Sequence, residues 1–190
     1  MKKNLLTSIW MTLATTILLG VIYPLVVTGL AQVLFPRQAN GSLIRVKGRV
    51  VGSELIGQPF SARGYFISRP SGAGAGYDPT QSGSSFLAPT NRALSDRVAA
   101  SVRQLQLENG DTPIPIDLVT QSGSGLDPDI SPVAAEFQAP RVARERGMSQ
   151  AEVRTLITKH TQGRAFGFLG ESRVNVLELN LELDRTHPLH

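Results

Sequence analysis

Residues Asn4–Pro36 read NLLTSIWMTLATTILLGVIYPLVVTGLAQVLFP and contain no charged side chain. A helix of this length reaches about 50 Å, whereas the hydrocarbon core of a bilayer is about 30 Å thick. The apolar part of a cleaved signal peptide is only about 7–15 residues long. The stretch therefore predicts a retained transmembrane helix. It divides the chain into an anchor, residues 1–36, and a single mixed α/β (α+β) domain, residues 37–190.

The composition excludes several classes of protein. The chain of 190 residues has 19 lysines and arginines, 15 aspartates and glutamates, and no cysteine. Basic residues do not cluster with aromatic ones, so a nucleic-acid-binding surface is not expected. Without cysteine there is no disulfide framework, no thiolate nucleophile and no cysteine-based zinc site.

The charges beside the apolar stretch give opposing signals about orientation. Lys2 and Lys3 favour a cytoplasmic N-terminus, but four basic residues follow the stretch: Arg37, Arg45, Lys47 and Arg49. Long domains cross the membrane largely regardless of charge, so the expected arrangement has the N-terminus inside and an extracytoplasmic domain.

Small residues recur at every fourth position of the anchor. They are Ser8, Thr12, Thr16, Gly20, Pro24 and Thr28. Such a ridge lets a second helix approach closely in lipid, although serine and threonine often only bond back to their own helix. Proline cannot donate a backbone hydrogen bond, so a bend is expected near Gly20–Pro24.

The domain shows alternating strand and helix signals. Alternation predicts strands at 44–50, 114–119 and 174–183, the last with a phase slip at Val176–Leu177. The first strand would place Arg45, Lys47 and Arg49 on one face. Helix signals cover three segments: one from the cap Asn91 to Gly110, one from Ser131 that Pro140 interrupts, and one from the capping box at Ser149. Residues 71–89 are rich in glycine, serine and proline and predict a long irregular loop.

No catalytic motif of a nucleotide hydrolase, serine hydrolase or zinc peptidase is present, and two polar loops remain as candidate sites. The loop of Gln121, Ser122, Gly123, Ser124 and Gly125 offers backbone amides to an anion, or is simply a turn before the next helix. Three carboxylates supply oxygen atoms that suit the approach of a cation, with arginines following closely: Asp127, Asp129 and Glu136.

Several strings of the domain are long enough to be specific. They are Tyr65–Ser71, Tyr77-Asp78 with Ser82–Ser84 and Pro89–Asn91, Asp117–Pro128, Phe168–Glu171 and Arg173–Asn180. Together with the anchor they resemble the C chain (KdpC family) of the bacterial Kdp potassium-transporting P-type ATPase.

The resemblance implies an accessory subunit of an ATP-driven, high-affinity potassium import complex in the bacterial inner membrane. In that family a separate chain hydrolyses ATP and a channel-like chain passes potassium, so these chains and membrane lipid are the implied partners. The C chain stabilises the assembly and acts as a catalytic chaperone that raises the ATP affinity of the hydrolytic chain. ATP is the only cofactor implied, with no covalent group and no metal. If ATP contacts this chain, Gln121–Gly125 is the expected site.

Three interpretations of the domain stay open. Because ATP is cytoplasmic, an extracytoplasmic domain would affect ATP binding only indirectly, through the anchor. If the domain contacts ATP directly, it lies in the cytoplasm. A cap over the outer potassium entrance fits the expected orientation better. A membrane-anchored enzyme or binding protein acting alone is the remote alternative, because no catalytic motif supports it.

Overall fold

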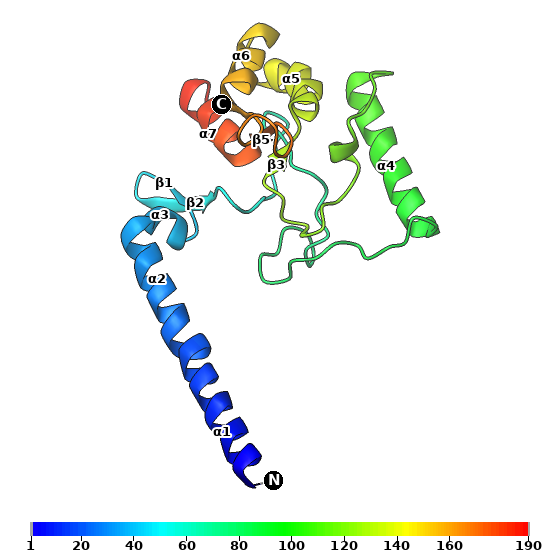
Figure 1. Cartoon of the computed structure of the whole chain (residues 1–190). Coiled ribbons are helices and arrows are strands. Elements are labelled where there is room, and N and C mark those ends of the chain that lie inside the picture. Colours follow the sequence, from blue (N-terminus) through cyan, green and yellow to red (C-terminus); the bar gives the residue numbers. More distant parts are fainter. Residues whose placement is uncertain (1, 190) are drawn as a thin grey trace. The chain divides into compact units, whose positions relative to one another are not determined.

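The structure, a computed structural model, describes residues 2–189 as helices with two small sheets (Figure 1). The chain forms two compact units, one extending to Val51 and the other beginning at Gly52. The mixed α+β class and the single long apolar helix at the N-terminus are confirmed. The first unit contains α1 (Lys2–Ile17), the π-helical turn η1 (Leu18–Ile22), α2 (Tyr23–Leu34), α3 (Pro36–Ala39), β1 (Leu43–Val46) and most of β2 (Arg49–Ser53).

Three of these elements form one continuous helix, Lys2–Leu34. By length and composition it is the only helix among residues 2–189 that is able to cross a membrane. None of its residues is buried within the described chain. Its apolar side chains are therefore available to lipid or to other helices.

The helix changes its hydrogen-bond pattern directly before Pro24. Tyr23 N donates to Leu18 O, five residues earlier, which defines the π-helical turn. Pro24 has no amide hydrogen to give to Gly20 O, and its ring crowds the preceding turn. A wider turn relieves that crowding, and the π-helical turn Leu18–Ile22 lies where the bend was expected.

The single strand predicted at 44–50 is wrong, because the segment is a hairpin. Strands β1 and β2 pair with each other and are joined by Lys47 and Gly48. Both joining residues have positive φ angles, 50° and 81°. This is the backbone of the two-residue turns that join hairpin strands. Lys47 therefore lies in the turn and does not share a strand face with Arg45 and Arg49.

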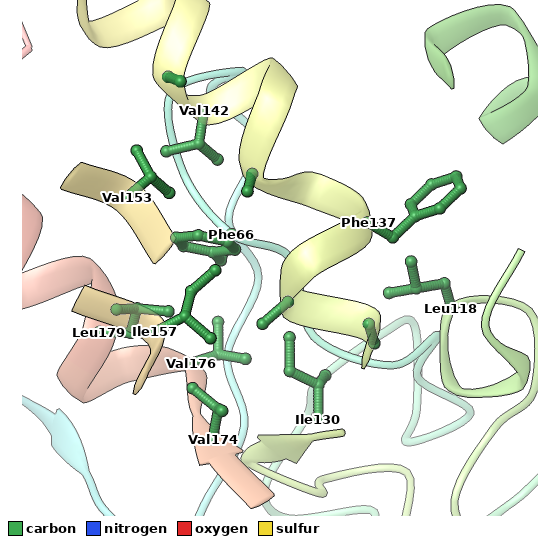
Figure 2. Close-up of a cluster of buried hydrophobic side chains, with 14 of the residues drawn as sticks. Phe66, Leu118, Ile130, Phe137, Val142, Val153, Ile157, Val174, Val176 and Leu179 are labelled. Atoms are coloured by element: carbon green, nitrogen blue, oxygen red, sulfur yellow. The ribbon is translucent and has the colours of Figure 1, made fainter. Parts of the chain in front are cut away.

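The second unit is built around a three-stranded antiparallel sheet in the order β3-β5-β4. Its elements are α4 (Arg92–Asn109), the 3-10 helix η2 (Ile116–Leu118), β3 (Asp129–Ile130), α5 (Pro132–Arg146), α6 (Gln150–His160), β4 (Thr161–Gln162), β5 (Arg173–Asn175) and α7 (Val176–Thr186). Phe66, Ile157 and Leu179 lie together in the core formed by the sheet and helices α5–α7 (Figure 2).

One predicted helix begins and ends as expected, and a second begins as expected. The Asn91 side chain accepts a hydrogen bond from Ala93 N at 2.9 Å, and Gly110 ends α4 with a φ of 60°. Helix α6 opens with the complete capping box between Ser149 and Glu152. Each side-chain cap satisfies a backbone amide that has no partner within its own helix.

Helix α5 continues through Pro140, so the predicted interruption is wrong. Ser131 caps the helix as expected, with its hydroxyl accepting from Ala134 N at 3.1 Å. Ala139 and Arg141, on either side of the proline, are both buried. A proline inside a helix costs about 3 kcal/mol, which the burial of several apolar side chains exceeds.

The two other predicted strands are wrong for related reasons. Residues 116–118 form a 3-10 turn in which Leu118 is buried while Ile116 is 70% exposed, so the apolar residues do not share a face. At the C-terminus only Arg173–Asn175 is a strand. The apparent phase slip marks the start of α7, whose buried residues follow helical spacing: Val176, Leu177, Leu179, Asn180 and Leu183.

Residues 57–90 are all described and contain no helix or strand, which includes the irregular loop expected at 71–89. Side chains from the helices replace a neighbouring strand for part of this segment. Ile67 N donates to Gln138 Oε1 at 2.8 Å, and Gln138 Nε2 donates to Ile67 O at 3.1 Å. The segment is thereby fixed over α5, and its later residues reach the loop that follows η2.

Candidate functional site

Arg69 joins the irregular segment to the loop that follows η2. Its guanidinium forms an ion pair with Asp127 Oδ2 at 3.2 Å, and both side chains are more than two-thirds buried. The same group reaches Thr120 Oγ1 and Gln121 O at 3.4 Å. A planar guanidinium with several donors suits this bridging position. Two segments far apart in sequence therefore form one polar region.

The predicted anion loop, Gln121–Gly125, is held against residues 71–83. Ser71 Oγ donates to Gly125 O at 2.6 Å, and Gly83 N donates to Ser124 O at 2.8 Å. Gly125 has a φ of 65°, and a side chain there would lie 2.4 Å from Gly83 O. Glycine is therefore required at this position by both conformation and space.

A cavity of about 350 Å³ opens beside this loop, lined by Gln121, Ser122 and Gly123. Arg97 of α4 also lines it and donates to Gln121 Oε1 at 3.0 Å. Arg97 Nε is buried and has no hydrogen-bond partner among the described residues. A guanidinium beside serine hydroxyls and a glycine-rich backbone offers donors to an anionic group.

Part of the loop's hydrogen-bonding capacity is already used within the loop. Gly125 N donates to Ser122 Oγ at 3.0 Å, and Leu126 N donates to Ser124 Oγ at 3.1 Å. An anion in the cavity would therefore meet the Ser122–Gly123 end of the loop together with Arg97. The sequence did not predict that Arg97 belongs to this site. The pattern that could have indicated it is a basic residue next to the apolar residues Leu94 and Val98 of α4.

Two of the three predicted cation-attracting carboxylates lie together. Asp127 and Asp129 line an open pocket of about 530 Å³, whereas Glu136 is not among its lining residues. Glu136 lies on α5 and pairs with Arg154 at 3.0 Å. The turn at 127–129 is fixed by Asp129 N, which donates to Asp127 Oδ1 at 3.1 Å.

Asp127 and Asp129 are each paired with an arginine. The guanidinium of Arg173 lies 3.0 Å from the carboxylate of Asp129, and that of Arg69 lies 3.2 Å from the carboxylate of Asp127. Burial raises the pKa of Asp129 above its usual range, and Arg173 acts in the opposite direction. Residues 2–189 contain no group of three or more acidic or histidine side chains suited to a metal ion. The pocket lining as a whole contains four carboxylates and two arginines, so it carries an excess of negative charge.

Another acid of the pocket lining, Asp117, serves the fold. Its carboxylate accepts a hydrogen bond from Ser131 N at 2.7 Å, directly before α5. Burial acts to raise the pKa of Asp117, but the hydrogen bond from Ser131 holds it below its usual range. Asp117 is thus an ionised acceptor that fixes the start of α5 and the adjacent pocket wall.

The ridge of small residues lies along an exposed helix. Its members are Ser8, Thr12, Thr16, Gly20, Pro24 and Thr28, none of them buried. Ser8 Oγ donates to Asn4 O at 2.6 Å, the bond back to its own helix that the sequence left as an alternative. A side chain added at Gly20 would meet only Thr16, at 3.9 Å. The ridge has room for a neighbouring helix to approach closely.

Comparison with known proteins gives a consistent result. The family model described as "K+-transporting ATPase, c chain" matches residues 5–185. A potassium-transporting ATPase KdpC subunit from Koribacter versatilis is 58% identical over 189 residues, covering 100% of this chain and 98% of the relative. The subunit of the same name from Acidobacterium capsulatum is 56% identical over 97% of this chain and 100% of the relative. The subunit of the same name from Myxococcus xanthus is 53% identical over 97% of this chain and 89% of the relative.

Proposed function

Since this chain belongs to the family of the c chain of the K+-transporting ATPase, we propose that it stabilises the potassium import complex without hydrolysing ATP itself. Membership makes it an accessory subunit with other chains of the complex as partners. Its finer role is that of a catalytic chaperone, which raises the ATP affinity of the hydrolytic chain.

The observation that carries this proposal is the exposed helix Lys2–Leu34. Lipid provides no hydrophobic drive for helices to associate, so small residues that allow close packing decide where they meet. The ridge from Ser8 to Thr28 supplies such a surface, and Leu, Ile and Val side chains on the remaining faces suit lipid. The anchor is then both a membrane attachment and a subunit contact.

The proposed orientation places the N-terminus in the cytoplasm and the domain outside. Lys2 and Lys3 support it, and a long domain crosses the membrane despite basic residues near the span. An extracytoplasmic domain does not meet ATP, so the effect on ATP affinity passes through the anchor. The irregular turn before Pro24 is a place where the helix can adjust to its partners.

The test replaces Gly20 with leucine in the complete complex, with Ala14→Leu as the matched control on the opposite side of the same helix. The complex is isolated through a tag on the channel-like chain, and the amount of this subunit and the KM for ATP are measured. Gly20→Leu should lower the amount of subunit and raise the KM, whereas Ala14→Leu should change neither. Equal recovery of both variants would contradict the proposal.

A second candidate function is a cap over the outer potassium entrance. It is favoured by the open pocket that Asp127 and Asp129 share. Asp129→Asn should then raise the KM for potassium and leave the KM for ATP unchanged. Lys159→Gln, which alters an exposed charge on α6, is the control and should leave both constants unchanged.

Direct contact with nucleotide requires the opposite orientation. It is supported by the cavity that joins Arg97 to Gln121–Gly123. Protease added to intact spheroplasts should digest an extracytoplasmic domain and spare a cytoplasmic one. If the domain is protected and Arg97→Gln raises the KM for ATP, nucleotide contact replaces the indirect effect.

A further inference from the structure

The connection between β4 and β5, residues 163–172, carries a group of exposed apolar side chains. Phe166 is 88% exposed, Phe168 71% and Leu169 50%. These three residues are called the apolar tip below. Single apolar residues are common on protein surfaces, but a contiguous group usually marks a place where something binds.

The backbone holds the apolar tip in a defined shape. Ala165 and Leu169 exchange two hydrogen bonds, each of 2.9 Å. An ion pair of 3.6 Å between Arg164 and Glu171 follows nearer the sheet. Below it, Gln162 pairs with Arg173 in the β4–β5 ladder. The connection is therefore braced at three levels.

Phe166 occupies a conformation that does not suit it. Its φ is 53°, in the left-handed region that favours glycine, and Gly167 follows with 82°. A phenylalanine in this region is uncommon, because its Cβ crowds the backbone. With 88% of its surface exposed, it contributes almost no burial within the described chain. An unfavourable backbone state with no gain inside the fold points to a role outside it.

The groups around the apolar tip distinguish between lipid and protein. Arg164 and Glu171 give the rim charges of both signs, and Glu171 is 88% exposed. A carboxylate is unfavourable beside anionic lipid, whereas an apolar centre with a mixed polar rim is the usual composition of a protein interface. Glu171 and Arg173 also line the pocket that contains Asp127 and Asp129, so the tip continues into the candidate site.

We infer that the apolar tip is a docking site for another chain of the potassium ATPase complex, which receives Phe166 and Phe168 in an apolar pocket. The edge of this pocket on the partner chain carries a carboxylate that pairs with Arg164 and a basic group that pairs with Glu171. This inference rests on the proposed function, because it needs the chain to work inside the complex. It adds a contact made by the domain to the one made by the anchor.

The first test is the double variant Phe166→Ser/Phe168→Ser in the complete complex. Aromatic residues at the centre of an interface often contribute a tenfold or greater change in affinity, so association should weaken at least about tenfold. Leu107→Ser is the control, because Leu107 is 89% exposed on α4, outside the tip. The unfolding temperature of the isolated full-length variants should stay unchanged, since these side chains pack little within the chain. Unchanged association of the double variant overturns the inference.

The second test uses the absence of cysteine from the chain. Phe168→Cys is labelled with a thiol-reactive photo-crosslinker before the complex is assembled and is irradiated afterwards, and Leu107→Cys serves as its control. An adduct between position 168 and a partner chain is expected, with none from position 107. Adducts with lipid alone, or no adduct at all, overturn the inference.

These results separate the two proposals. If the unaltered chain fails to co-purify with the other chains, the proposed function fails before the tip is tested. If it co-purifies and only the results for the tip are negative, the accessory role stands and the docking site is wrong.

Discussion

The side-chain amide of Asn180 forms both hydrogen bonds that a neighbouring strand would give to Phe66. Phe66 N donates to Asn180 Oδ1 at 2.9 Å, and Asn180 Nδ2 donates to Phe66 O at 2.9 Å. Both residues are essentially inaccessible to solvent. Because buried backbone groups need partners, this amide allows an irregular segment to cross the core.

Asn180→Leu should destabilise the protein by about 2–4 kcal/mol, because it leaves two buried backbone groups of Phe66 without partners. Urea unfolding of the full-length chain in detergent measures the loss. Gln150→Leu, at an exposed position of α6, is the control and should change stability by less than about 0.5 kcal/mol. Equal stability of the two variants would show that Phe66 finds other partners.

Arg141→Lys should also destabilise the fold, by about 2 kcal/mol or more. The buried guanidinium donates to Tyr65 O, Gln138 Oε1 and Arg63 O and lies 3.1 Å from Glu108. Burial lowers the pKa of Arg141, and Glu108 opposes that shift. Lysine lacks the planar fork that reaches these acceptors together.

The control for Arg141→Lys lies on the same helix. Arg144→Lys changes an arginine whose side chain is 60% exposed, so it should leave stability nearly unchanged. Thermal unfolding of both variants under the same conditions gives the comparison. If Arg141→Lys unfolds at the temperature of the unaltered protein, the buried network is not a major source of stability.

Glu182 should make stability depend on pH in the acid range. Hydrogen bonds from Arg185, and then from Lys159, hold the pKa of Glu182 at about 2, against an ordinary value of 4.5. A lowered folded-state pKa gives stability that is complete above about 4.5 and is lost as the pH falls towards 2. The free energy of unfolding should therefore decline over this range, and less steeply in Glu182→Gln. Identical slopes for the two proteins would contradict this assignment.

The sequence predicted those elements whose signals are local. The capping box at Ser149 and the asparagine cap at Asn91 satisfy amides within three residues, so neighbouring residues suffice to recognise them. The strand predicted after Val174 failed because leucines at 177, 179, 181 and 183 alternate, while helix α7 also buries Val176 and Asn180. The local cap was missed: the Asn175 side chain accepts a hydrogen bond from Glu178 N at 3.1 Å at the start of α7. The contact of Asn180 with Phe66, 114 positions away, agrees with the helical periodicity.

The candidate site was predictable in part for the same reason. Asp127 and Asp129 are close in sequence and share a pocket, but Glu136 is turned towards Arg154 by α5. The arginines that neutralise or complement the loops come from distant segments: Arg69, Arg97 and Arg173. Their participation depends on the packing of the irregular segment and of α4, which no local pattern reports.

Two glycines of the loop at 121–125 give a matched test of how it is held. A Cβ at Gly125 would lie 2.4 Å from Gly83 O and 2.7 Å from Ala73 N, and its φ is 65°, whereas one at Gly123 would meet nothing within 4 Å. Gly125→Ala should therefore separate the loop from residues 72–83, and Gly123→Ala should leave it in place. Hydrogen exchange of the Gly83 amide, which donates to Ser124 O at 2.8 Å, should become at least about tenfold faster only in Gly125→Ala. Equal protection in both variants would mean that the backbone shifts to accept the methyl group. In that case the contact with residues 72–83 would not be what fixes the loop beside Arg97.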